Sequence, residues 1–126
     1  MKALNIVETA YRATLEEQDD PVVWLTHAMT GAGADLNILL RGNAVNYAVK
    51  GQAVEGLTFG DRKQKHGPRL ADDVAGLIGK GVEVYVVAED MDERGLETDE
   101  LISGLRPVAR AELPALFEAH DRVWHW

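Results

Sequence analysis

The chain has 126 residues, 46% of them hydrophobic, and a formal net charge of −8 at pH 7. A chain of this size can bury one core without a disulfide or a structural metal, so we expect a single domain over residues 1–126. The negative charge repels phosphate backbones and argues against nucleic acid as a partner. The sequence contains no cysteine, which excludes disulfides, thiolate metal sites and thiol catalysis.

The first residues do not resemble a secretory signal, because Glu8 and the polar residues after it end the short apolar run. No apolar run approaches the ~20 residues that a membrane span needs. We therefore expect a cytoplasmic protein that has no membrane partner.

Strands and helices are expected to alternate along the chain. Runs of branched residues predict strands at residues 2–8, 34–40, 82–87, 105–109 and 122–126. Apolar spacing and capping residues predict helices at residues 22–30, 44–50, 99–103 and 112–120, and another that begins at Pro68. This order predicts an α/β fold with a parallel five-stranded sheet covered on both faces. Strand 82–87 should lie centrally, and Pro107 places strand 105–109 at an edge.

Two of the helices have distinct signals. Asp20 and Pro21 form an acidic cap followed by proline at the first helical position, and Trp24, Leu25 and Ala28 are expected to face inward. In the helix that begins at Pro68, the apolar residues recur at helical spacing on one stripe. These residues are Leu70, Val74, Leu77 and Ile78.

The predicted loops and caps complete the outline. Residues 11–20 and 52–67 lack clear periodicity and are predicted as loops, the second with a cationic cluster at residues 62–66. Asn43 and Thr98 are the expected caps of the helices that follow them.

Ligands of open parallel sheets bind beyond the carboxyl ends of the strands. This rule selects residues that follow the predicted strands, and the cationic loop could fold over the same edge. The candidates for ligand binding are Glu8, Tyr11, Arg41, Asn43, Asp90, Met91 and, from the loop, His66.

Each candidate also has a structural interpretation. Arg41 can clamp an anion or form a surface ion pair, and Asn43 can cap a helix or adjoin an anion site. Glu89 and Asp90 can act as a general acid/base pair or remain solvated loop charges. The histidines have no metal-motif spacing, and the chain has no dinucleotide fingerprint or P-loop, so we expect no metal and no cofactor.

Several segments resemble the DsrE/DsrF-like (YchN-like) sulfur-relay family. They are the first strand, the junction at residues 39–45, the strand at 81–86, the Arg94–Gly95 turn and the closing segment at 111–116. The resemblance implies a three-layer α/β/α sandwich, assembly into trimers or hexamers, and a persulfide cysteine that passes sulfur to a partner. The family's cysteine positions correspond to Val87 and Asp90, so Val87 joins the candidates.

Two hypotheses follow. The favoured one is a non-catalytic, homo-oligomeric member that binds a small ligand or a protein partner of a sulfur-metabolism pathway. The alternative is an enzyme that uses Glu89 or Asp90 as acid/base and Arg41 as the clamp for a small anionic substrate. Whether any catalysis remains is left open. Trp124 and Trp126, two apart on the last strand, share a face and need cover, either from the domain's own helices or from another subunit. Cover from another subunit would support an oligomer, whereas packing in the domain's own core is the expectation for one of the two.

Overall fold

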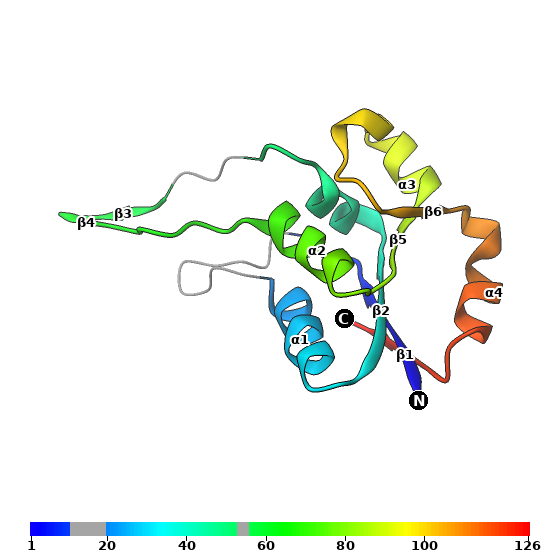
Figure 1. Ribbon diagram of the computed structural model, residues 1–126. Helices are drawn as coiled ribbons and strands as arrows, with labels where there is room; N and C mark the ends of the chain where they lie inside the picture. Colours follow the sequence, from blue (N-terminus) through cyan, green and yellow to red (C-terminus); the bar gives the residue numbers. More distant parts are fainter. Residues whose placement is uncertain (11–19, 53–55) are drawn as a thin grey trace.

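The computed structural model describes residues 1–10, 20–52 and 56–126. Its main sheet has five parallel strands in the order β6-β5-β2-β1-β7 (Figure 1). The strands are β1 (Lys2–Val7), β2 (Asp35–Leu40), β5 (Val84–Val87), β6 (Arg106–Val108) and β7 (Arg122–His125). The predicted α/β fold is confirmed, and β6 lies at an edge as Pro107 indicates. β2 takes the central place, with β5 beside it.

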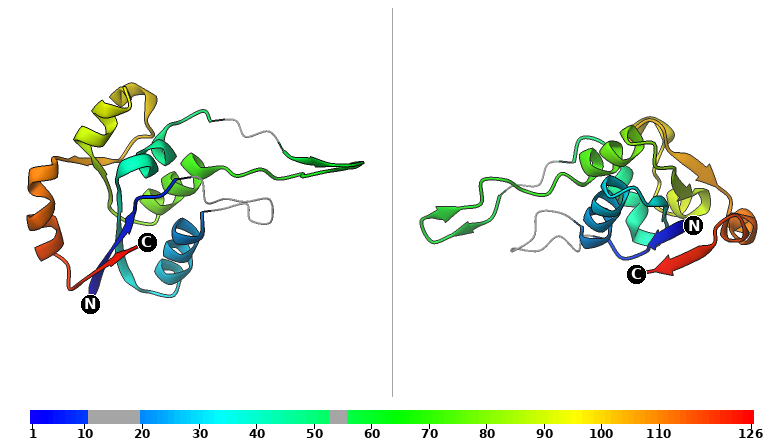
Figure 2. Two further views of the ribbon diagram at one scale, coloured as in Figure 1. Left: turned by 180° about the vertical axis from the view of Figure 1, so that it is seen from behind. Right: turned by 60° about the horizontal axis from the view of Figure 1, so that its bottom comes forward.

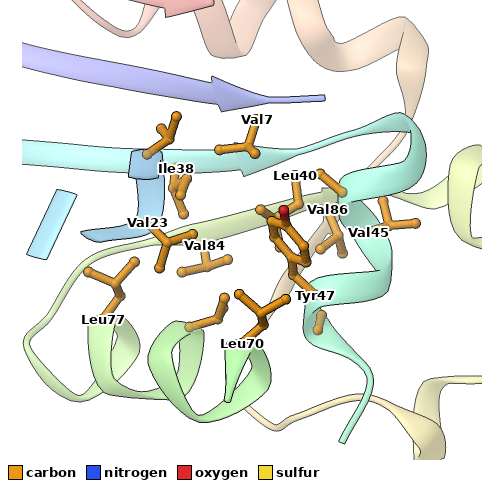
Figure 3. Close-up of a cluster of buried hydrophobic side chains, with 14 of the residues drawn as sticks. Val7, Val23, Ile38, Leu40, Val45, Tyr47, Leu70, Leu77, Val84 and Val86 are labelled. Atoms are coloured by element: carbon orange, nitrogen blue, oxygen red, sulfur yellow. The ribbon is translucent and has the colours of Figure 1, made fainter. Parts of the chain in front are cut away.

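The larger core lies on the sheet face covered by α1 (Pro21–Gly31), α2 (Leu70–Gly79) and the 3₁₀ helix η1 (Gly42–Ala48). Figure 3 shows Val7, Ile38 and Val84 of the strands converging with Tyr47 and Leu77 from these helices. The predicted stripe of α2 is confirmed, since its members are buried or partly buried against this core.

The opposite face is covered by α4 (Leu113–Glu118). Leu4, Ile6, Leu39 and Val87 form a smaller core there with Leu113. The two faces thus place helices on both sides of the sheet, as a three-layer sandwich requires (Figure 1).

Helix α1 begins as predicted but presents a different face. The carboxylate of Asp20 accepts hydrogen bonds from the backbone N–H groups of Val22 and Val23 at 2.9 and 3.2 Å. Val22, Val23 and Thr26 are buried, whereas the side chain of Trp24 is 58% exposed. The prediction of an inward Trp24 was wrong, and Ala28 is exposed as well. Because this helix is apolar on most sides, its sequence does not single out the buried face.

The predicted caps Asn43 and Thr98 are also corrected. Helix η1 begins at Gly42 after Arg41, so Asn43 lies inside its first turn and its side chain serves a contact described below. In η2 (Thr98–Glu100) the residue before the helix is Glu97, whose N–H donates to the Glu100 carboxylate at 2.8 Å. The predicted helix 99–103 is therefore a single turn that lies earlier in the chain.

The predicted loop at residues 52–67 contains a hairpin. Strands β3 (Thr58–Phe59) and β4 (Arg62–Lys63) pair in antiparallel fashion across a turn at Gly60. We call residues 56–69 the hairpin arm. Figures 1 and 2 show it projecting from the sandwich, away from α4 and from α3 (Ala88–Glu93). Hydrophobic patterning does not predict these strands, because their residues are exposed and lack apolar alternation.

No helix among the described residues is both long and apolar enough to cross a bilayer. The loop predicted at residues 11–20 lies outside the described residues except for Asp20, and so does the candidate Tyr11.

Candidate functional site

Asp90 lies where three strand ends meet at the carboxyl edge of the sheet. It follows β5 in the first turn of α3 and is 7% exposed. One carboxylate oxygen accepts the backbone N–H of Gly42, after β2, at 2.7 Å. The other accepts the Nη2 of Arg110, after β6, also at 2.7 Å. Asp90 therefore links three neighbouring strand–helix junctions.

Glycine at position 42 suits this contact. Its φ of 55° is in the left-handed region that glycine adopts most readily. A Cβ there would make only an ordinary contact of 3.4 Å with the Glu8 side chain, so the cost of a larger residue comes from the backbone conformation. The Leu40–Arg41–Gly42 junction thus presents an N–H to a carboxylate across the edge.

Arg94 provides a second link between the same junctions. Its Nη1 donates to the backbone carbonyl of Asp90 at 3.0 Å, and its Nη2 donates to the side-chain oxygen of Asn43 at 2.8 Å. Asn43 consequently fixes the edge through its side chain, a role that its residue type alone does not indicate.

The partners of Asp90 decide its protonation state. Burial alone raises the pKa of Asp90, but the Gly42 N–H and the charged hydrogen bond from Arg110 outweigh it and lower the pKa below its usual value. The pKa of Arg110 is raised, chiefly by its hydrogen bonds to Asp90 and Glu93. At neutral pH the pair is therefore a carboxylate and a guanidinium, with no proton available for exchange.

Glu89, the other carboxylate of the expected pair, points to a different partner. Its two oxygens accept the backbone N–H of Arg110 at 3.0 and 2.8 Å. This contact holds the start of η3 (Arg110–Glu112). Glu89 and Asp90 therefore both bind the β6–η3 junction, and neither is left as a solvated loop charge.

A separate cluster forms at the ends of β1, β2 and β7. Glu8 lies 2.6 Å from His125 Nε2 and 3.9 Å from Arg41 Nε. Arg41 precedes Gly42, so this cluster adjoins the Asp90 site. The edge rule thus brought Glu8, Arg41, Asn43 and Asp90 together as predicted.

The other candidates are distributed elsewhere. Val87 and Met91 are buried, at 1% and 6% exposure, on opposite sides of the sheet. His66 is exposed on the hairpin arm, which projects away from this edge (Figure 1). The loop that carries it does not fold over the strand ends.

Sequence reasoning left Arg94 and His125 outside the residues selected at the strand ends, whereas it reached Arg110 without giving it a role. Arg110 was visible as the first charged residue after the fourth predicted strand, and Arg94 served only as part of a landmark turn. The pairing of β5 with β6, in register at Val87 and Val108, is what places Arg110 beside Asp90. Among the described residues, no three His, Asp or Glu side chains are arranged to hold a metal ion.

An apolar groove of about 440 Å³ lies next to the His125 cluster, between α1 and β7. It is lined by Leu25, Met29, Val123, Trp124, His125 and Trp126. Trp124 is half-buried, and Trp126 is 44% exposed while its indole N–H donates to Asn5 at 3.3 Å. Because four consecutive residues, 123–126, line the groove, the shared face expected for the two tryptophans stays a prediction.

The family model described as "DsrE/DsrF-like family" matches residues 6–125. The chain belongs to the DsrE/DsrF-like family. The match spans the strand junctions that build the Asp90 site, in agreement with the resemblance read from the sequence.

Solved structures of the same fold span nearly the whole chain. The YchN protein from E. coli has 20% identity and a TM-score of 0.71, covering 99% of this chain and 98% of its own. BT1422 from Bacteroides thetaiotaomicron has 12% identity and a TM-score of 0.66, with 99% and 94% covered. MTH1491 from Methanobacterium thermoautotrophicum has 14% identity and a TM-score of 0.61, with 97% and 96% covered. No curated protein matches the chain.

Proposed function

We propose that this DsrE/DsrF-like protein is a non-catalytic, homo-oligomeric, cytoplasmic binding protein. It binds an anionic group of a small ligand or of a protein partner at the carboxyl edge of its sheet. A sulfur-metabolism pathway is the proposed setting, through the family to which the chain belongs.

The carrying observation is the state of Asp90. No thiol is present in the chain, so it cannot itself hold a persulfide. Asp90 stands at one of the expected cysteine positions, and its carboxylate accepts hydrogen bonds from the Gly42 N–H and from Arg110, each at 2.7 Å. A general acid/base needs a pKa near the working pH, whereas the pKa of Asp90 is shifted the opposite way. This argues against the alternative enzyme.

Binding is supported by the cations at the edge. Arg110 and Arg41 keep 51% and 34% of their side chains exposed, although each faces a carboxylate. A guanidinium has five N–H donors, so one that serves a carboxylate can still bind another anion. The neighbouring groove offers apolar surface to the same ligand or partner.

The first test follows amide resonances of the full chain during titration with phosphate, sulfate and thiosulfate. We expect saturable shifts at Gly42 and Arg110, reduced about tenfold in affinity by Arg110→Gln. Arg122→Gln is the matched control, because Arg122 is exposed and lies at the start of β7, at the end of the sheet away from the carboxyl edge. Equal weakening by both variants, or no saturable shift, would contradict an anion site at this edge.

A second test examines whether the carboxyl edge can support a reactive thiol. Because the chain has no cysteine, Asp90→Cys and Val87→Cys each introduce a single thiol. The Gly42 N–H and Arg110 favour a thiolate at position 90, whereas position 87 is enclosed by apolar side chains. We expect polysulfide to add sulfur to Asp90→Cys at least ~10-fold faster than to Val87→Cys, as measured by intact mass.

A further inference from the structure

The hairpin arm is exposed along most of its length, and its charge is opposite to that of the whole chain. It carries four cationic side chains and one carboxylate, whereas the complete chain has a net charge of −8. Arg62, Lys63 and Lys65 have no ion pair among the described residues. The arm therefore presents unpaired positive charge on an acidic protein.

Apolar side chains accompany these cations. Phe59 is 54% exposed and Leu57 is 41% exposed. The two strands of the arm pair only with each other, since they form a separate two-stranded sheet. An isolated hairpin of this kind is marginally stable in water, so a surface that covers it would stabilise it. Exposed aromatic surface with cations beside it is the composition of an interface centre and its rim.

The complementary charge lies on α3 and η2. Between residues 89 and 100 the chain has seven carboxylates and a single arginine, and we call this stretch the acidic segment. Its side chains Asp92, Glu97 and Asp99 are exposed and have no cationic partner among the described residues. Within one copy, the arm points away from this segment in every view (Figures 1 and 2).

We infer that the hairpin arm of one copy docks on the acidic segment of another copy. The inference rests on the proposed homo-oligomer and names the surfaces that join it. Each copy supplies one arm and one acidic segment, which are different surfaces, so the contact is heterologous and repeats head to tail until a ring closes. Arg62, Lys63 and Lys65 face Asp92, Glu97 and Asp99 across the contact, and Phe59 is covered at its centre.

The contact would also border the Asp90 site. The acidic segment includes Asp90 and Glu93, and Arg110 lies 3.4 Å from Glu93. An arm docked there brings a neighbour's cations and His66 close to the carboxyl edge. The sequence predicted that the loop with His66 could fold over this edge; in the docked arrangement, the His66 near the edge would come from another copy.

Charge reversal on each surface tests whether the hairpin arm and the acidic segment form the contact between copies. We compare the full chain with an arm variant (Arg62→Glu with Lys63→Glu) and an acidic-segment variant (Asp92→Lys with Asp99→Lys), using native mass spectrometry and light scattering at micromolar concentration. Like charges at the contact should weaken self-association of either variant about 100-fold. Mixing the two variants should restore assembly, because the reversed arm complements the reversed segment.

The matched control is Asp35→Lys with Glu118→Lys, which reverses two exposed carboxylates elsewhere and should assemble as the unaltered chain does. Circular dichroism verifies that each variant folds. A monomeric unaltered chain would overturn both the oligomer and the arm contact. An oligomer that survives both reversals would overturn the arm contact alone. The same conclusion would follow if only Trp124→Ala with Trp126→Ala, in the groove, caused the oligomer to dissociate.

Discussion

Charged side chains are paired at the carboxyl edge of the sheet and mostly unpaired on the hairpin arm. At the edge, Asp90, Arg94 and Arg110 are bound to one another or to neighbouring backbone at distances of 2.7 to 3.0 Å. On the arm, Arg62 and Lys63 extend toward solvent without an ion pair among the described residues. Charges paired within a chain contribute to its fold even where they keep donors for another anion, whereas unpaired exposed charges contribute little to the fold and remain available to another molecule.

The largest effect should come from removing a buried polar contact of the body. Asp20 caps α1 with one oxygen and accepts the buried Tyr47 hydroxyl with the other at 2.6 Å. Asp20→Ala removes the cap and a hydrogen-bond partner of that hydroxyl, so we expect a loss of about 2–4 kcal/mol in unfolding free energy. Urea denaturation measures it. A loss no greater than that of the exposed control Asp35→Ala would contradict the role given to Asp20.

A smaller effect is expected at the edge. Asp90→Ala leaves the Gly42 N–H without its partner and should cost about 1–3 kcal/mol. Asp90→Asn keeps an acceptor of the same shape but loses the charge that Arg110 faces, so it should cost about 1 kcal/mol or less, because Arg110 is half exposed. If Asn costs as much as Ala, the hydrogen bond to Gly42 does not have the importance assigned to it.

The cost of Asp90→Asn should depend on pH. Because the pKa of Asp90 is lowered in the folded protein, its stabilising contribution is present above the ordinary aspartate value of about 3.9. It is lost as pH falls through the lower folded value, since protonation removes the charge from the wild-type side chain too. The stability difference between the two proteins should thus be constant from pH 7 to about 5 and shrink below about 4. A difference that grows on acidification would give the wrong sign.

The smallest effect on stability should come from the arm. Arg62→Glu with Lys63→Glu alters exposed side chains without ion pairs, so the unfolding free energy of the dissociated protein should change by less than about 0.5 kcal/mol. Denaturation is measured at protein concentrations low enough for the monomer to predominate, so that the change in unfolding free energy contains no contribution from assembly. A large destabilisation would mean that the arm contributes to the fold of its own chain, and the contrast between the two regions would fail.

The sequence predicted the sheet well because strand and helix signals alternate in it. Residues 36–40 are apolar except for Asn37, and residues 84–87 are rich in valine, so both runs indicate buried strands. The edge rule then brought Glu8, Arg41 and Asp90 to the same edge. Pro107 correctly indicated an edge position for β6, because proline has no backbone N–H to donate to a second neighbouring strand. These successes depend on local residue type and on connectivity, which are both visible in one dimension.

The failures depend on information that only the folded chain holds. Trp24 lies on a helix with apolar residues on most sides, so the buried face is chosen by the sheet beneath it. Arg110 meets Asp90 through the register of β5 with β6, which single-sequence patterns do not encode. The hairpin arm has no apolar alternation because neither of its faces is buried in its own copy.

The pairing of β1 with β7 has a consequence for how the chain folds. Ala3 pairs with Arg122, and the Lys2 N–H donates to Asp121, a separation of 119 residues. Contacts this distant in sequence form late, because closing so long a loop is entropically costly. During synthesis β1 therefore pairs first with β2 and keeps one open side until β7 has emerged. Until the residues of β7 have been made, one edge of β1 therefore lacks its partner strand, and an unpaired strand edge can pair with another chain.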